Sequence, residues 1–224
     1  MNRKTFLMST STGLLAAGVP SDSLAANADP PMSAAAALKN LMAGNTRFSS
    51  DQPIPRRFMN RVRQIASGQS PFATVLGCAD SRVPVETIFD HEPGDIFTVR
   101  LAGNFITDAI LGSIEYAVAV LKSPLIMVLG HTSCGAVKAA VDFVKTGKPL
   151  PGHMQSLAAA IEPAAKAVQH NPGDWLHNAV VENVRLNAQQ LRSSTPILAE
   201  AVRTNTVDVV GAVYDLGSGK VTVV

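Results

Sequence analysis

This 224-residue sequence lacks several features that mark common classes of protein. It has no long block of lysine and arginine, and its formal net charge is only +2, which argues against a nucleic-acid-binding protein. Charged residues make up 16% of the chain and the apolar set AVILMFWYC makes up 46%, a balance typical of a globular domain rather than a disordered one. With only two cysteines, Cys78 and Cys134, the chain can form one disulfide at most.

The first residues differ in character from the rest. Arg3 and Lys4 precede an apolar stretch at 6–19, which is too short and too broken for a permanent membrane helix, and small residues follow at 26–28. This order of a positive start, an apolar middle and a small-x-small end predicts a secretory signal peptide over 1–28. Residues 2–7 also resemble a twin-arginine signal with Lys4 in place of the second arginine. We therefore expect an exported protein, periplasmic in a Gram-negative bacterium, with one mature domain over 29–224 and no stable membrane insertion after cleavage.

Strand and helix patterns alternate through the rest of the chain. The continuous apolar run at 125–129 predicts a central parallel strand buried on both faces, and 73–76, 95–101 and 207–213 predict three more strands. Helices are expected at 33–42, 58–66, 85–89, 107–121, 136–144 and 174–191, with a connecting arm at 45–55 and a hairpin at 214–224. The sequence predicts an α/β fold with a mostly parallel central β-sheet flanked by helices.

Residues able to bind a metal follow two of these strands. Cys78 comes after the strand at 73–76, and His131 and Cys134 come after the strand at 125–129. Sites in open α/β sheets form beyond the carboxyl ends of the strands, so the two loops are expected at one edge. Two thiolates and one imidazole suit a catalytic zinc, which keeps a fourth position open. A buried packing role for each cysteine, or a disulfide between them, remains an alternative at this point.

Asp80 and Arg82 lie close to the first of these cysteines in sequence. A carboxylate two residues from a zinc cysteine can bind the ion or accept a hydrogen bond from a zinc-bound hydroxide, and a guanidinium can hold that carboxylate in a two-pronged pair. Zinc lowers the pKa of bound water to near neutrality and so supplies a strong nucleophile. The alternative is an ordinary Asp–Arg pair on the surface.

Two segments together resemble the signature of the β-carbonic anhydrases: CADSRVP at 78–84 and GHTSCG at 130–135. The segments EPGDIF at 92–97, RLAGN at 100–104, IEYA at 114–117 and YDL at 214–216 are also similar to that family. The resemblance implies a homodimer or higher homo-oligomer with one zinc ion per subunit. It also implies reversible hydration of carbon dioxide to bicarbonate and a proton, by attack of zinc-bound hydroxide.

The resemblance also implies roles for individual residues. Cys78, His131 and Cys134 match the zinc ligands of the family, and Asp80 and Arg82 match its catalytic dyad. Gln69, Phe97 and Tyr116 match positions that line the substrate pocket, in part across the dimer interface, and Gly135 matches a position whose backbone amide faces the substrate. Simple core packing is the alternative for the two aromatic residues.

Two positions depart from the pattern of the family. Some members shut themselves off when the aspartate displaces the zinc water, and these carry a tryptophan where this chain has Val75. We therefore expect an open site, with Asp80 bound to Arg82 and water on the zinc. The second departure is the segment LAGN at 101–104, where many relatives have Asn-x-Ala-Asn.

Three other functions remain as hypotheses. A carbonyl sulfide or carbon disulfide hydrolase would use the same scaffold and the same zinc. A non-catalytic zinc or bicarbonate-sensing protein would keep Asp80 as a fourth ligand. A thiol redox protein would use the two cysteines, but the chain lacks a Cys-x-x-Cys pair, and this hypothesis leaves His131 and Asp80 unexplained.

Overall fold

The computed structural model describes residues 32–224, so the expected signal peptide at 1–28 lies outside the described residues. The helices of the described part are α1 (Ala34–Ser49), α2 (Phe58–Gln64), α3 (Val85–Ile88), α4 (Asp108–Ala119), α5 (Gly135–Thr146), α6 (Met154–Ala167), α7 (Trp175–Ser193) and α8 (Ile197–Arg203). The strands are β1 (Ala73–Gly77), β2 (Ile96–Arg100), β3 (Leu125–His131), β4 (Asp208–Tyr214) and β5 (Val221–Val223).

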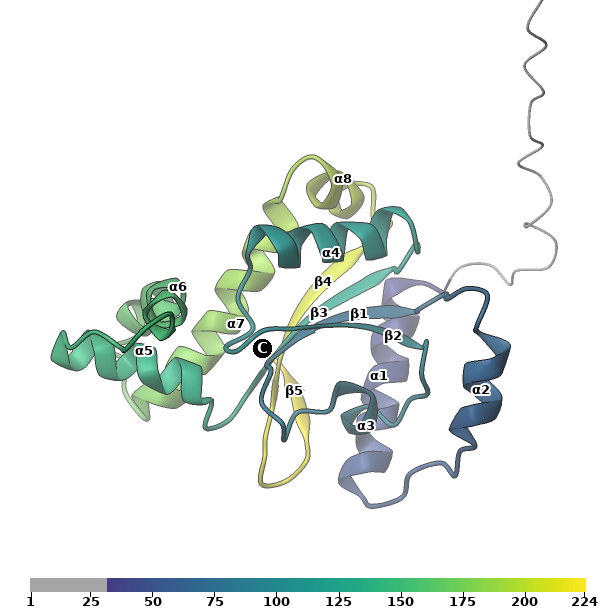
Figure 1. The fold of residues 1–224 in the computed structure, drawn as a ribbon, viewed down its shortest axis with the longest axis horizontal. Helices are drawn as coiled ribbons and strands as arrows, with labels where there is room; N and C mark the ends of the chain where they lie inside the picture. Colours follow the sequence, from purple (N-terminus) through teal and green to yellow (C-terminus); the bar gives the residue numbers. More distant parts are fainter. Residues whose placement is uncertain (1–31) are drawn as a thin grey trace, which may run out of the picture. The chain divides into compact units, whose positions relative to one another are not determined.

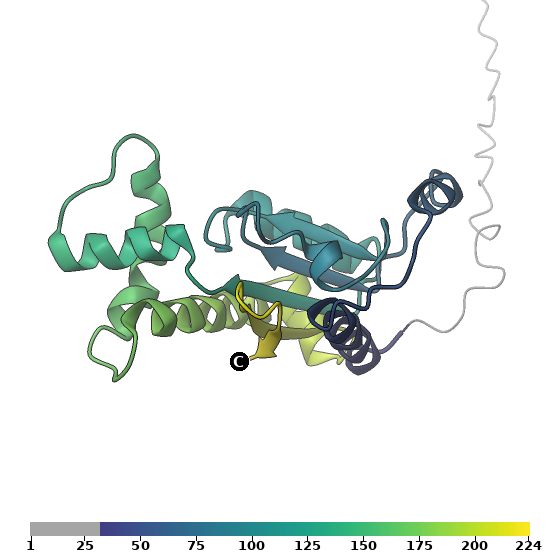
Figure 2. The ribbon, with the colours of Figure 1, turned by 90° about the horizontal axis from the view of Figure 1, so that it is seen from below.

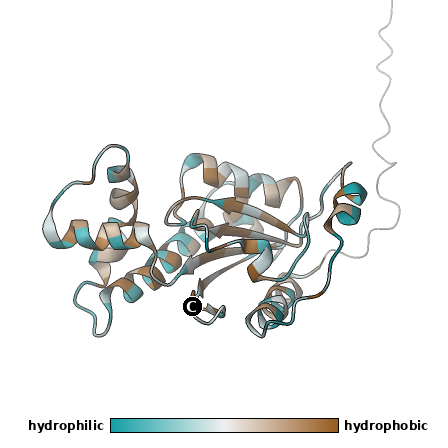
Figure 3. Ribbon diagram, turned by 60° about the horizontal axis from the view of Figure 1, so that its bottom comes forward, coloured by the Kyte–Doolittle hydropathy of each residue, from teal (hydrophilic) through white to brown (hydrophobic). Residues whose placement is uncertain are grey.

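The five strands form one sheet in the order β2-β1-β3-β4-β5 (Figure 1). The first four strands are parallel to their neighbours, and β5 runs antiparallel to β4. Every residue of β3 is buried, as its continuous apolar run predicts, and every residue of β1 is buried as well; Figure 3 shows the strands of the sheet in the colours of apolar residues. The predicted α/β fold with a mostly parallel sheet is confirmed.

Each face of the sheet carries its own hydrophobic core. Successive side chains of a strand point to opposite faces, so Val75 packs with the core under α1 and α3, while Leu76 packs with the core under α4, α5, α6, α7 and α8. Helices α5 and α6 extend past the carboxyl ends of the parallel strands, and α2 lies at the opposite end (Figures 1 and 2). The loops that follow β1 and β3, and the start of α5, therefore lie just beyond the carboxyl ends of these strands.

Several predicted helix ends are confirmed in detail. The Thr107 side chain accepts a hydrogen bond from the backbone amide of Ile110 and so caps α4, and Asp174 caps α7 in the same way. The predicted end of the first helix is wrong, because α1 continues into the first part of the expected arm and ends at Ser49. Asn45 explains this extension: it is buried, and its amide binds the backbone of Ile88, Gly219 and Val221.

Candidate metal centre

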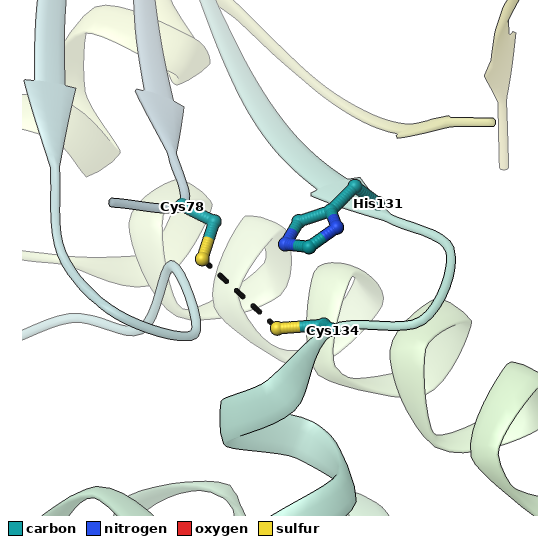
Figure 4. Close-up of side chains that lie close together, drawn as sticks. All are labelled: Cys78, His131 and Cys134. Carbon is teal, nitrogen blue, oxygen red and sulfur yellow. Dashed lines mark hydrogen bonds between the residues drawn. The ribbon is translucent and has the colours of Figure 1, made fainter. Parts of the chain in front are cut away.

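Three potential metal ligands meet at the carboxyl ends of β1 and β3. Cys78 directly follows β1, His131 is the last residue of β3, and Cys134 directly precedes α5. Because β1 and β3 are parallel neighbours, with Gly77 beside Leu129, their ends bring these residues together. Their ligand atoms all lie within 4.8 Å of one another, and the three side chains point toward a common centre (Figure 4).

The spacing of the ligand atoms fits a zinc ion. The sulfurs of Cys78 and Cys134 are 4.0 Å apart, near the ~3.8 Å that two Zn–S bonds of ~2.3 Å span in a tetrahedral site. A disulfide needs about 2.05 Å, and both cysteines are free. The alternative of a disulfide between them is therefore wrong in this structure.

The imidazole of His131 supplies independent evidence for a missing partner. Its Nε2 atom is buried and has no hydrogen-bond partner in the part of the chain that the structure describes, although a buried polar atom without a partner costs roughly 1–3 kcal/mol. The other ring nitrogen, Nδ1, lies 3.0 Å from the backbone oxygen of Thr132, which orients the ring and leaves Nε2 free for a metal. The donor set of two sulfurs and one nitrogen therefore fits zinc.

The two thiols are hydrogen-bonded to each other. The bond between the sulfurs of Cys78 and Cys134, which either thiol could donate, lowers the pKa of Cys78 against the opposing effect of burial, with smaller contributions from His131 and the Gly103 amide. The same interaction, together with burial, raises the pKa of Cys134. Both thiols must be deprotonated to bind a metal, and the lowered pKa of Cys78 favours this for one of the two sulfurs.

The carboxyl-terminal part of the chain holds the turn between His131 and Cys134. The backbone amide of Thr132 donates to the oxygen of Tyr214 at 2.9 Å, and its hydroxyl accepts from the amide of Leu216 at 3.0 Å. Ser133 then takes a left-handed conformation with φ of 57°, which turns the chain into α5. Sequence reasoning did not identify Thr132, whose partners lie more than 80 residues away.

The expected pair of Asp80 and Arg82 is present. Asp80 Oδ1 accepts from the backbone amide and the Nε of Arg82, both at 2.9 Å, and Oδ2 accepts from Nη2 at 2.8 Å. These bonds hold the pKa of Asp80 well below its usual range and raise that of Arg82. Asp80 Oδ2 also lies 3.9 Å from Nε2 of His131, so the carboxylate faces the metal cluster from its more exposed side.

Arg100 braces the loop that carries Cys78 and Asp80. Its Nε donates to the backbone oxygen of Cys78 at 2.9 Å, and its Nη2 donates to that of Asp80 at 2.6 Å. Sequence reasoning used Arg100 only as part of the family resemblance and missed this role. The register of β1 and β2 could have indicated this role. Arg100 lies beside Gly77 in this parallel pair, and Gly77 directly precedes Cys78.

The residues expected to line the substrate pocket fall into two groups. Gly135 begins α5 next to the metal cluster and is exposed. Phe97 and Tyr116 lie together, with ring centroids 6.2 Å apart, but Phe97 aligns with Thr74, about 13 Å along the strand from Cys78. Gln69 is exposed and precedes β1, at the end opposite the cluster. One chain therefore does not bring Gln69, Phe97 and Tyr116 to its own metal centre.

Comparison with known proteins supports the same interpretation. A family model described as "Carbonic anhydrase" matches residues 73–221, which include all three cluster residues. A carbonic anhydrase of Mycolicibacterium smegmatis is 38% identical over 193 residues, covering 86% of this chain and 94% of the relative. Carbonic anhydrase 2 of Mycobacterium tuberculosis is 37% identical, covering 85% of this chain and 93% of that protein.

A solved structure shares the fold. That structure, of the β-carbonic anhydrase CcaA, superposes with a TM-score of 0.67 at 26% identity, covering 83% of this chain and 94% of that one. The similarity thus spans nearly all of the residues that the structure describes, including both cores and the metal centre.

Proposed function

The chain belongs to the β-carbonic anhydrase family, and from this premise we propose that it hydrates carbon dioxide reversibly, to bicarbonate and a proton, at one zinc ion per subunit. The observation that carries the proposal is the buried cluster of Cys78, His131 and Cys134, in which Nε2 of His131 has no hydrogen-bond partner among residues 32–224. A carboxylate, Asp80, faces this cluster and is held by Arg82.

The three cluster residues would hold the ion. When bound, zinc lowers the pKa of a coordinated water toward neutrality and so makes a nucleophilic oxygen available. Thr132 orients His131 through Nδ1, and Gly103 donates its backbone amide to the sulfur of Cys78 at 3.3 Å. These contacts keep the ligand atoms in place before the metal arrives.

Asp80 is assigned the role of orienting the nucleophile. Its lowered pKa keeps the carboxylate ionised at neutral pH, so it acts as a hydrogen-bond acceptor there. Accepting a hydrogen bond from the nucleophilic oxygen directs a lone pair of that oxygen toward the carbon of carbon dioxide. Arg82 fixes the carboxylate by two parallel bonds, which favours the expected open arrangement over one with Asp80 as a fourth metal ligand.

We propose that the active assembly is a homodimer or a higher homo-oligomer. Gln69, Phe97 and Tyr116 are too far from the metal centre of their own chain to line it, so a second copy would have to supply them. Helix α2 buries none of its residues, and Phe58 and Met59 on it are 54% and 61% exposed. Apolar surface of this kind is suited to contact with another subunit.

Export to the periplasm is proposed from the sequence of residues 1–28, which lie outside the described part. No helix within 32–224 has the length and apolar character needed to cross a membrane. We expect the mature chain to begin near Asp29 and to consist of a single catalytic domain. Mass spectrometry of the protein recovered from periplasmic extract tests this, and a chain that keeps residues 1–28 would contradict it.

Metal analysis combined with stopped-flow hydration of carbon dioxide tests the proposed function. The wild-type protein should contain one zinc per subunit, and Cys134→Ser should lose zinc and activity together because one of three ligands is removed. Lys138→Ala is a control on the same helix, since its exposed pair with Asp142 contributes little. A zinc-free Cys134→Ser protein with full activity would contradict the proposal.

Substrate competition separates the proposal from its alternatives. Carbon dioxide, carbonyl sulfide and carbon disulfide are compared on the same metal-replete protein, and carbon dioxide should be by far the best substrate. Faster turnover of either sulfur compound would favour a hydrolase on this scaffold. Metal-replete protein without any hydration activity from pH 6.5 to 9 would favour a sensor.

A further inference from the structure

A loop between β2 and α4 contacts one of the cluster sulfurs. The backbone amide of Gly103 in this loop donates to the sulfur of Cys78 at 3.3 Å, and the contact is buried. Gly103 has φ of 88°, and the following residue, Asn104, has φ of 42°. A glycine is free to adopt many backbone conformations. Hydrogen bonds from outside the loop must therefore hold Gly103 in the conformation that directs its amide at the sulfur.

Two asparagines of α7 supply such bonds. Asn183 donates its side-chain amide to the backbone oxygen of Gly103 at 2.9 Å, and Asn187 accepts from the amide of Ile106 at 3.0 Å. Asn187 also donates to the side-chain oxygen of Asn183 at 3.1 Å, so the two residues orient each other one helical turn apart. Their exposed fractions are only 2% and 7%.

Helix α7 is itself fixed against the strand that carries His131. A β-carbon on Gly130 would lie 2.6 Å from a methyl group of Val184, and one on Gly211 would lie 2.7 Å from the other methyl group. Because these two glycines have no side chain, Val184, the neighbour of Asn183, packs directly against the backbone of β3 and β4. This contact sets the position of α7 relative to the metal centre, and α7 in turn sets the position of the loop.

We propose that Asn183 is a positioning residue for the metal centre: by binding Gly103 it keeps that amide directed at the Cys78 sulfur and so slows the loss of the metal. An N–H donor withdraws charge from a thiolate and fixes its direction, and partners of metal ligands typically affect metal affinity by about 10- to 100-fold. Asn187 supports this arrangement from the next turn. The inference rests on the proposed zinc site.

The test measures how fast the holoenzyme gives up zinc to an excess of a colorimetric chelator. Asn183→Ala should release zinc about 10-fold faster than wild type. Asn45→Ala is a matched control, because Asn45 is also buried and also binds backbone groups, but its partners Ile88 and Val221 belong to the other core, under α1 and α3. The control should lower the melting temperature to a similar extent and leave the release rate within twofold of wild type.

A second variant and a spectrum keep the test decisive. If Asn183→Ala does not fold, Asn187→Ala is used in its place, with a smaller increase in release rate expected. In the cobalt-substituted protein the thiolate-to-cobalt absorption band should shift in the α7 variants and stay unchanged in Asn45→Ala. Equal release rates for the Asn183 and Asn45 variants, or an unshifted band in the α7 variants, would overturn the inference.

The outcome also separates this inference from the proposed function. Wild-type protein that holds zinc but does not hydrate carbon dioxide contradicts the function, while the release rates still decide the role of Asn183. Active wild-type protein whose α7 variants keep zinc like the control contradicts only the inference. Wild-type protein that binds no zinc contradicts both.

Discussion

Asp80 and Asp90 are both paired with arginine, yet they belong to regions with different tasks. Asp90 is 3% exposed and binds groups of two other segments: Arg47 of α1, and both Arg56 and the amide of Ile54 in the arm between α1 and α2, residues 50–57. Asp80 is bound by Arg82, only two residues away. An ion pair between segments far apart in the chain fixes how those segments pack together. A pair between near neighbours fixes only the orientation of the carboxylate itself.

The surroundings of the two carboxylates support this distinction. Asp80 Oδ2 lies 3.9 Å from Nε2 of His131, at the metal centre. Asp90 lines a cavity of about 640 Å³ between the arm and α3, together with Phe48 and Phe58. The pair at Asp80 thus lies beside the cluster of the proposed active site, whereas the ion pairs of Asp90 attach the arm to the body of the domain.

The largest expected effect is on activity, from Asp80→Asn. Asparagine has nearly the same shape but carries no charge and cannot accept hydrogen bonds at both positions, so we expect hydration to slow by about 100-fold or more. Zinc content should stay at one per subunit and the melting temperature should change little. Stopped-flow rates and metal analysis on the same sample check this, and activity within threefold of wild type would contradict the role of Asp80.

The next effect is on stability, from Asp90→Asn. Removing the buried carboxylate leaves the guanidinium groups of Arg47 and Arg56 without their partner, and we expect a loss of about 2 kcal/mol in the free energy of unfolding. Denaturant titration measures the loss. Activity per folded, zinc-loaded molecule should be retained.

Asp51→Asn is the matched control for that measurement. Asp51 is an exposed residue of the same cavity, and we expect its replacement to change stability by less than about 0.5 kcal/mol. Equal losses for Asp51→Asn and Asp90→Asn would show that the buried cluster does not attach the arm. A large loss of activity in folded Asp90→Asn would show that the two regions are not separate.

The smallest effect is a pH dependence of stability due to Asp90. Burial alone would raise the pKa of Asp90, but hydrogen bonds from Arg56 and Arg47 outweigh burial and lower the pKa to about 2. A lowered pKa contributes stability that is present above the ordinary value of 3.8 and is lost as the pH falls toward about 2. The stability difference between wild type and Asp90→Asn should therefore shrink below about pH 4. A difference that stays constant from pH 5 to pH 2.5 would contradict this account.

Local features of the fold could be predicted from the chain alone. The strands β1 and β3, the caps at Thr107 and Asp174, and the meeting of Cys78 with His131 all follow from short segments and from one general rule. Helices α6 and α8 were not predicted individually, and Pro163 lies inside α6. Their apolar residues pack on α5 and α7, so packing against neighbours decides them more than propensity does.

The sequence by itself therefore determined the fold class, the meeting of Cys78, His131 and Cys134, and the Asp80–Arg82 pair, because each is encoded in residues that lie close together or at the ends of neighbouring strands. Only the tertiary structure decided that Asn183 supports Gly103 and that Gln69 lies away from the centre of its own chain. Asn183 and Gly103 are 80 positions apart. No local pattern records such a contact, because it depends on how closely α7 approaches β3.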